Sequence, residues 1–123
     1  MKGKLLLIED NEQNLYMMRF LLEKRGYAVM SAANGREGIQ MALDQNPQAI
    51  LLDIQLPEMD GYAVAAELKK HEQLKQVPII AVTSYAMLGD REKILGAGAD
   101  GYIEKPIDPE TFVEEVEKYV KRS

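Results

Sequence analysis

The stretch AILLDIQLPEMDG, residues 49–61, begins with an apolar run that leads directly into Asp53. The run AILL shows no alternation of apolar and polar residues, which is typical of a strand covered on both faces. Two further runs have the same character, LLLI at residues 5–8 and IIAV at residues 79–82. We therefore expect at least three strands to lie inside a parallel sheet.

Amphipathic stretches separate the apolar runs. Apolar residues recur at helical spacing in residues 13–25, 35–45, 61–70, 87–96 and 109–121. The expected strands are Lys4–Ile8, Ala28–Ser31, Ala49–Ile54, Pro78–Thr83 and Gly101–Ile103. This alternation predicts an α/β fold of the flavodoxin-like (βα)5 type, a three-layer sandwich whose parallel five-stranded sheet has the order 2-1-3-4-5.

Two sequence signals mark helix ends. Gly26 follows the first helical stretch and is expected to cap its carboxyl end. Asp108 and Pro109 combine a capping side chain with a residue suited to the first helical position, so we expect the last helix to begin there.

Composition narrows the class of protein. The chain has 123 residues, 46% of them hydrophobic and 28% charged, which is typical of one globular domain over residues 1–123 with no output domain. No apolar run approaches the ~20 residues that a membrane helix needs. The chain has no Cys, which excludes disulfides and favours a cytoplasmic location. Its net charge of −5 argues against nucleic acid as a partner.

Polar residues gather where the predicted strands end. Glu9 and Asp10 follow the first strand, Asp53 ends the third, Thr83 ends the fourth and Lys105 follows the fifth. Because parallel strands end at one edge of a sheet, these side chains are expected to meet, with the acids at the crevice between strands 1 and 3.

Acids this close need a positive partner. Two carboxylates ~4 Å apart repel by roughly 4 kcal/mol at an effective dielectric constant of 20, a large part of a domain's ~5–15 kcal/mol of stability. Lys105 is one candidate partner, and a hard divalent cation such as Mg²⁺ is the other. A carboxylate, a cation, a hydroxyl and an ammonium group around one point favour phosphoryl transfer, with an Asp as the nucleophile.

Four motifs extend this interpretation to a family. They are LIEDN at 7–11, LLDIQLPEMDG at 51–61, AVTSYA at 81–86 and GYIEKPI at 101–107. Because these motifs occur together in this order and spacing, the chain resembles the receiver domain of two-component response regulators. Within that family it resembles the single-domain DivK type.

The resemblance implies a role for each residue that handles the phosphoryl group. Asp53 would be the phosphoacceptor, Thr83 would hydrogen-bond the phosphoryl group and Lys105 would pair with it. Tyr102 would be the switch aromatic whose ring turns inward after Thr83 shifts, and the Lys105-Pro106 bond would be cis. Taken alone, without the resemblance, Tyr102 is more typical of an ordinary half-buried aromatic.

The resemblance also implies a metal site for Mg²⁺, with Mn²⁺ as an alternative. Asp10 would bind the ion directly and Glu9 partly through water. Asp53 and the backbone carbonyl of Gln55 would complete the set. Asp10 and Asn11 could instead serve only as caps of the first helix.

As a function, the resemblance implies a binding module controlled by phosphorylation, with catalysis limited to phosphorylation and dephosphorylation of Asp53. A sensor histidine kinase or a His-phosphotransfer protein would supply the phosphoryl group. A kinase or effector would then read the surface of helix 4, strand 5 and helix 5. The chain would be a monomer or a weak phosphorylation-dependent dimer, and Tyr85 would tune the lifetime of the phosphorylated form.

Two other classes remain as alternatives. A small Mg²⁺-dependent phosphohydrolase would also use an Asp nucleophile, but it needs an acid at the position of Gln55. A flavodoxin-like cofactor protein would need phosphate-binding donors after strand 1, where Glu9, Asp10 and Glu12 would repel a phosphate.

Overall fold

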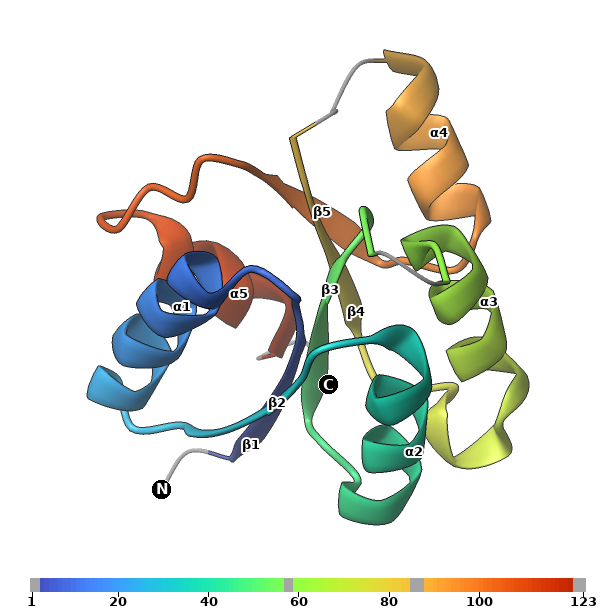
Figure 1. Ribbon diagram of the computed structural model, residues 1–123, viewed down its shortest axis with the longest axis horizontal. Helices are drawn as coiled ribbons and strands as arrows, with labels where there is room; N and C mark the ends of the chain where they lie inside the picture. Colours follow the sequence, from blue (N-terminus) through green and yellow to red (C-terminus); the bar gives the residue numbers. More distant parts are fainter. Residues whose placement is uncertain (1–2, 57–58, 85–87, 121–123) are drawn as a thin grey trace.

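The predicted sheet and its order are confirmed. A computed structural model of the chain describes residues 3–56, 59–84 and 88–120. Within these ranges, parallel strands pair in the order β2-β1-β3-β4-β5 (Figure 1). The strands are β1 (Lys4–Ile8), β2 (Ala28–Ala32), β3 (Ala49–Asp53), β4 (Ile79–Thr83) and β5 (Gly101–Glu104).

Helices cover both faces of the sheet. They are α1 (Glu12–Lys24), α2 (Gly35–Gln45), α3 (Gly61–Lys70), α4 (Leu88–Gly96) and α5 (Phe112–Val120), with a short 3₁₀ helix η1 (Glu72–Leu74). In Figure 1, α1 and α5 lie on one face, and α2, α3 and α4 lie on the other. None of the helices in the described ranges is both long and apolar enough to cross a bilayer.

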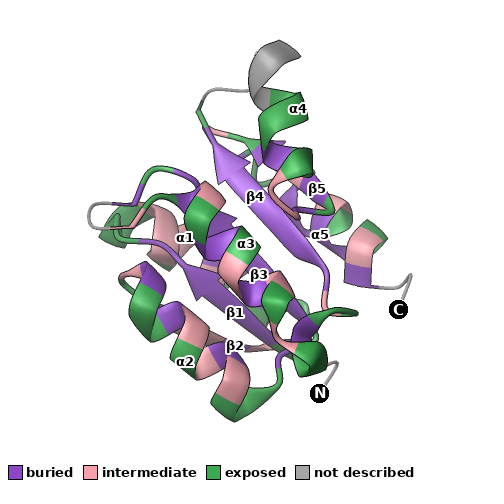
Figure 2. Ribbon diagram, turned by 90° about the vertical axis from the view of Figure 1, so that its right-hand side faces the viewer, coloured by how far each residue is buried: buried purple, intermediate pink, exposed green. Residues whose placement is uncertain are grey.

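Two apolar cores follow from the alternation of side chains along buried strands. Leu5 and Leu7 face the core under α1 and α5, whereas Leu6 and Ile8 face the core under α2, α3 and α4. Every residue of β3 and β4 is buried, as Figure 2 shows in purple. The continuous apolar runs of the sequence therefore correspond to strands covered on both sides.

Helix ends follow the sequence signals with one exception. Gly26 adopts a positive φ of 108°, and the N–H groups of Gly26 and Tyr27 donate to carbonyl groups in the last turn of α1. The expected start of the last helix was wrong, because residues 109–111 form a turn and α5 begins at Phe112. The Asp108 carbonyl accepts the N–H groups of Thr111 and Phe112, which closes that turn before the helix starts.

Smaller differences concern strand ends. β4 begins at Ile79 rather than at Pro78, β3 ends at Asp53 rather than at Ile54, and β2 extends to Ala32. The prediction for Tyr85 lies outside the described residues.

Candidate functional site

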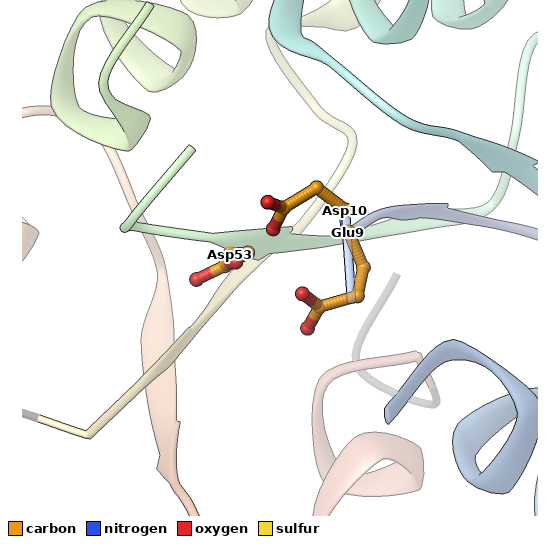
Figure 3. A group of neighbouring side chains, drawn as sticks. All are labelled: Glu9, Asp10 and Asp53. Atoms are coloured by element: carbon orange, nitrogen blue, oxygen red, sulfur yellow. The ribbon is translucent and has the colours of Figure 1, made fainter. Parts of the chain in front are cut away.

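Three carboxylates meet where β1 and β3 end. Glu9 and Asp10 follow β1, and Asp53 is the last residue of the neighbouring strand β3 (Figure 3). Each offers an oxygen within 4.8 Å of the others. Glu9 and Asp53 are 2% and 3% exposed, and Asp10 is exposed. The predicted cluster therefore forms, with two of its members removed from water.

Lys105 reaches this cluster from the end of β5. Its Nζ atom lies 3.2 Å from Glu9 Oε1 and 3.5 Å from Asp53 Oδ1. The backbone directs it there, because the Lys105 N–H donates to the Thr83 carbonyl at 2.8 Å. The Lys105-Pro106 peptide bond is cis, as the resemblance implied. One ammonium group thus faces two buried carboxylates.

Backbone N–H groups hold two of the acids. The Gln55 N–H donates to Asp53 Oδ1 at 2.9 Å, and the Asn11 N–H donates to Glu9 Oε2 at 3.2 Å. Each bond spans two residues, so the loop that follows a strand fixes the acid at the strand's end. Gln55 lies beside Asp53 as a result.

Asp10 and Asn11 were both candidates for capping α1, and they differ in the structure. The Asn11 side chain caps α1 by accepting the Asn14 N–H at 2.9 Å. Asp10, by contrast, lines the cleft beside Asp53. Only Asn11 is therefore the cap.

The site has more negative charge than Lys105 offsets. Burial raises the pKa of Glu9 most, the hydrogen bond and charge of the neighbouring Asp53 raise it in the same direction, and the pKa changes from 4.5 to about 7 as a result. The Asn11 N–H and the Lys105 charge act in the opposite direction, and they offset only part of this rise in pKa. Glu9 Oε1 is buried, and within the described residues its contact with the Lys105 ammonium group at 3.2 Å is an ion pair without hydrogen-bond geometry. The arrangement is suited to a further positive charge.

A cleft of about 500 Å³ opens onto these acids. Its lining includes Glu9, Asp10, Asp53, Gln55 and Lys105, together with residues of the first turn of α1. A set of oxygen donors with space for water suits a hard cation such as Mg²⁺. The residues present therefore fit a divalent metal ion.

Thr83 and Tyr102 lie beside this cleft rather than in its lining as far as the described residues show. Asp53 pairs with Val82, so Thr83 is one position further along β4, and it is 1% exposed. Tyr102 pairs with Ala81 and is half-buried against the core under α2, α3 and α4. It also lines a separate groove with Glu104 and Pro106.

The contact between Tyr102 and Arg91 was not predicted from the sequence. The Arg91 guanidinium carbon lies over the Tyr102 ring, 5.3 Å from its centroid. This contact depends on how α4 is placed against β5, which residue spacing along the chain does not give.

Comparisons with known proteins agree with the geometry. The family model for the response regulator receiver domain matches residues 5–117. The polar-differentiation response regulator DivK of Brucella anthropi is 41% identical over 120 residues, and the match covers 98% of each chain. DivK of Brucella ovis matches to the same extent.

Solved structures give the same result. The receiver domain of the sensor histidine kinase PA1611 from Pseudomonas aeruginosa, described with a magnesium ion in its active site cleft, is 35% identical with a TM-score of 0.89. That match covers 97% of this chain and 98% of the other. The chemotaxis response regulator CheY4 of Vibrio cholerae is 27% identical with a TM-score of 0.91, over 95% of this chain and 98% of the other.

Proposed function

The chain belongs to the response regulator receiver family, and we propose that Asp53 is the residue that accepts its phosphoryl group. One observation carries this assignment. The Asp53 carboxylate ends β3 at the floor of the acidic cleft, where its Oδ1 atom contacts the Gln55 N–H and the Lys105 ammonium group.

The chemistry of the transfer follows from these groups. A carboxylate oxygen of Asp53 attacks the phosphorus of a phosphorylated histidine on the donor protein. The new P–O bond forms as the P–N bond breaks, and the electron pair returns to the donor imidazole. Lys105, already 3.5 Å from Asp53, offers its ammonium group to a phosphoryl oxygen.

Glu9, Asp10, Asp53 and the backbone carbonyl of Gln55 are the ligands that we assign to Mg²⁺, with Mn²⁺ as the alternative ion. Support comes from the three carboxylates within 4.8 Å and from the magnesium ion described in the Pseudomonas receiver domain. The bound ion would neutralise charge on the phosphoryl oxygens.

We further propose that Thr83 and Tyr102 transmit phosphorylation to the surface of α4, β5 and α5. Thr83 would move toward the phosphoryl group, and the Tyr102 ring would turn inward into the space this opens. The surface would then shift between two packings, which is a population change between two states.

The partners in this proposal are those of two-component signalling. A sensor histidine kinase or a His-phosphotransfer protein would deliver the phosphoryl group, and a kinase or effector would read the changed surface. A cytoplasmic location and a monomer that dimerises weakly on phosphorylation both stay predictions. Catalysis would be limited to Asp53 itself, because Gln55 stands where a phosphohydrolase needs an acid.

Mass spectrometry after incubation with acetyl phosphate and Mg²⁺ tests the assignment. The wild-type chain should gain the mass of one phosphoryl group, and Asp53→Asn should gain none. Asp44→Asn is the matched control, because Asp44 is an exposed acid on α2 away from the cleft. Phosphorylation that persists in Asp53→Asn, or an unphosphorylated wild-type chain, would overturn the proposal.

A further inference from the structure

Two cation–π contacts attach α4 to its neighbours. Arg91 lies over the Tyr102 ring of β5, 5.3 Å from its centroid, and Lys93 Nζ lies 4.6 Å from the centroid of the Tyr62 ring of α3. Between residues 91 and 96, where the side chains of α4 are described, only Ile94 is buried. Among its described side chains, residues 91–96, the helix is therefore held by one buried apolar side chain and by these two contacts at the surface, so this part of α4 is weakly attached.

The position of Tyr102 in β5 makes its contact with Arg91 important. Side chains alternate along β5, so Ile103 enters the core under α1 and α5, and Tyr102 faces the side covered by α4. The ring is half-buried and borders the outer groove beside Glu104 and Pro106. We call this half-buried place beside the groove the outward position of the ring, and Arg91 lies over the ring there.

Arg91 has few competing contacts. The side chain is exposed, and it forms no ion pair with a carboxylate among the residues that the structure describes. The quadrupole of an aromatic ring attracts a guanidinium group directly above it. Among the residues that the structure describes, Tyr102 is therefore the partner found for this charge.

We propose that Arg91 is a positioning residue that acts through Tyr102 and holds the ring in its outward position. This inference rests on the proposed function, in which the ring turns inward. A contact made in only one of two states favours that state by its own free energy. Loss of an exposed cation–π contact should therefore raise the population of the inward state about two- to fivefold.

Beryllofluoride with Mg²⁺, a mimic of the phosphoryl group, provides the probe. Its apparent dissociation constant, measured from amide NMR shifts during titration, falls as the competent state becomes more populated. Arg91→Gln should lower this constant about two- to fivefold. Arg91→Lys keeps a cation over the ring and should restore a value near that of the wild-type chain.

Lys93→Gln is the matched control. It removes a similar contact from the same helix but leaves the Tyr102 ring untouched, so it should change the constant much less. In a Tyr102→Leu background, Arg91→Gln should have no further effect, because the ring through which it acts is gone.

Three results would overturn the inference. They are an unchanged constant in Arg91→Gln, an equal effect of Lys93→Gln, and an Arg91→Gln effect that survives in the Tyr102→Leu background. If the wild-type chain itself fails to bind beryllofluoride, the proposed function fails and this inference falls with it. A wild-type chain that binds the probe, with Arg91→Gln unchanged, contradicts the inference alone.

Discussion

Glu9 is the residue of the cleft whose charge depends most on its surroundings. Its carboxylate is 2% exposed and close to Asp53, and its pKa is about 7 rather than 4.5. A neutral Glu9 relieves the repulsion within the cluster, whereas a charged Glu9 is the form that binds a metal ion. Proton and cation should therefore compete for this residue.

This competition predicts how stability depends on pH. Without metal, the folded chain binds a proton at Glu9 more tightly than the unfolded chain does, so the contribution of Glu9 to stability falls as pH rises from 4.5 through about 7. The difference in Tm between the wild-type chain and Glu9→Gln, measured with a chelator from about pH 5 to about pH 8, should fall with pH. A difference that stays constant, or rises, would contradict the raised pKa.

At the scale of elements, α3 packs its first residue directly against the carboxyl end of β3. The Gly61 N–H donates to the Ile54 carbonyl at 2.9 Å. A Cβ atom at Gly61 would overlap the Ile54 Cα atom and lie 2.8 Å from the Asp53 carbonyl oxygen. Because backbone rather than a flexible side chain is in the way, the loop after β3 would have to move.

Gly61→Ala should therefore lower the free energy of unfolding by about 1–3 kcal/mol and slow phosphorylation at Asp53. Gly96→Ala is the control, because nothing lies within 4 Å of its added Cβ, and it should change stability by no more than about 1 kcal/mol. Urea unfolding and acetyl phosphate kinetics measure both variants. Equal behaviour of the two would refute the steric argument.

A buried polar link joins α5 to the loop before β2. Glu117 of α5 is 5% exposed and accepts hydrogen bonds from Tyr27 Oη and Arg25 Nη1, both at 2.8 Å. Burial and the Glu117 charge raise the pKa of Tyr27 to about 12. This link lies outside the acidic cleft, so it serves the packing of α5 and not the proposed chemistry.

Tyr27→Phe should cost about 1–2 kcal/mol of unfolding free energy, since it removes a donor from a buried carboxylate. Tyr16→Phe changes a tyrosine that is 74% exposed and should be neutral. Urea denaturation compares the two, and phosphorylation of Asp53 should proceed in both variants. A neutral Tyr27→Phe would show that this hydrogen bond contributes little.

For the whole molecule, the acidic cleft links stability to metal binding. An ion that binds only the folded chain raises the free energy of unfolding, by about 2.7 kcal/mol at a hundredfold excess over its dissociation constant. Glu9 and Asp53 are buried side by side, and the Lys105 ammonium group contacts both of them. When no metal ion is bound, the carboxylates of the cluster should therefore repel one another.

We expect Mg²⁺ to raise the Tm of the wild-type chain. Asp53→Asn should have a higher Tm than the wild-type chain in a chelator and should respond less to Mg²⁺, because one charge of the cluster is gone. Asp44→Asn should respond like the wild-type chain. Scanning calorimetry with and without Mg²⁺ measures all three, and equal responses of Asp53→Asn and the wild-type chain would argue against this metal site.

Much of the molecule was predictable from the chain alone. Strands buried on both faces need apolar residues at consecutive positions, so β1, β3 and β4 are visible as unbroken runs. The parallel topology then brings Glu9, Asp10, Asp53 and Lys105 to one edge. Each of these residues lies at or just beyond the end of a strand.

Tertiary structure alone decided features that depend on the distance between elements. The raised pKa of Glu9 follows from its burial beside Asp53. The contact of Arg91 with Tyr102 depends on how α4 lies against β5. The sequence by itself determined which residues share an edge, because apolar runs that alternate with helical stretches indicate parallel strands, and the carboxyl ends of parallel strands lie at one edge. It could not determine how closely side chains approach across elements, since packing of the whole chain sets those distances.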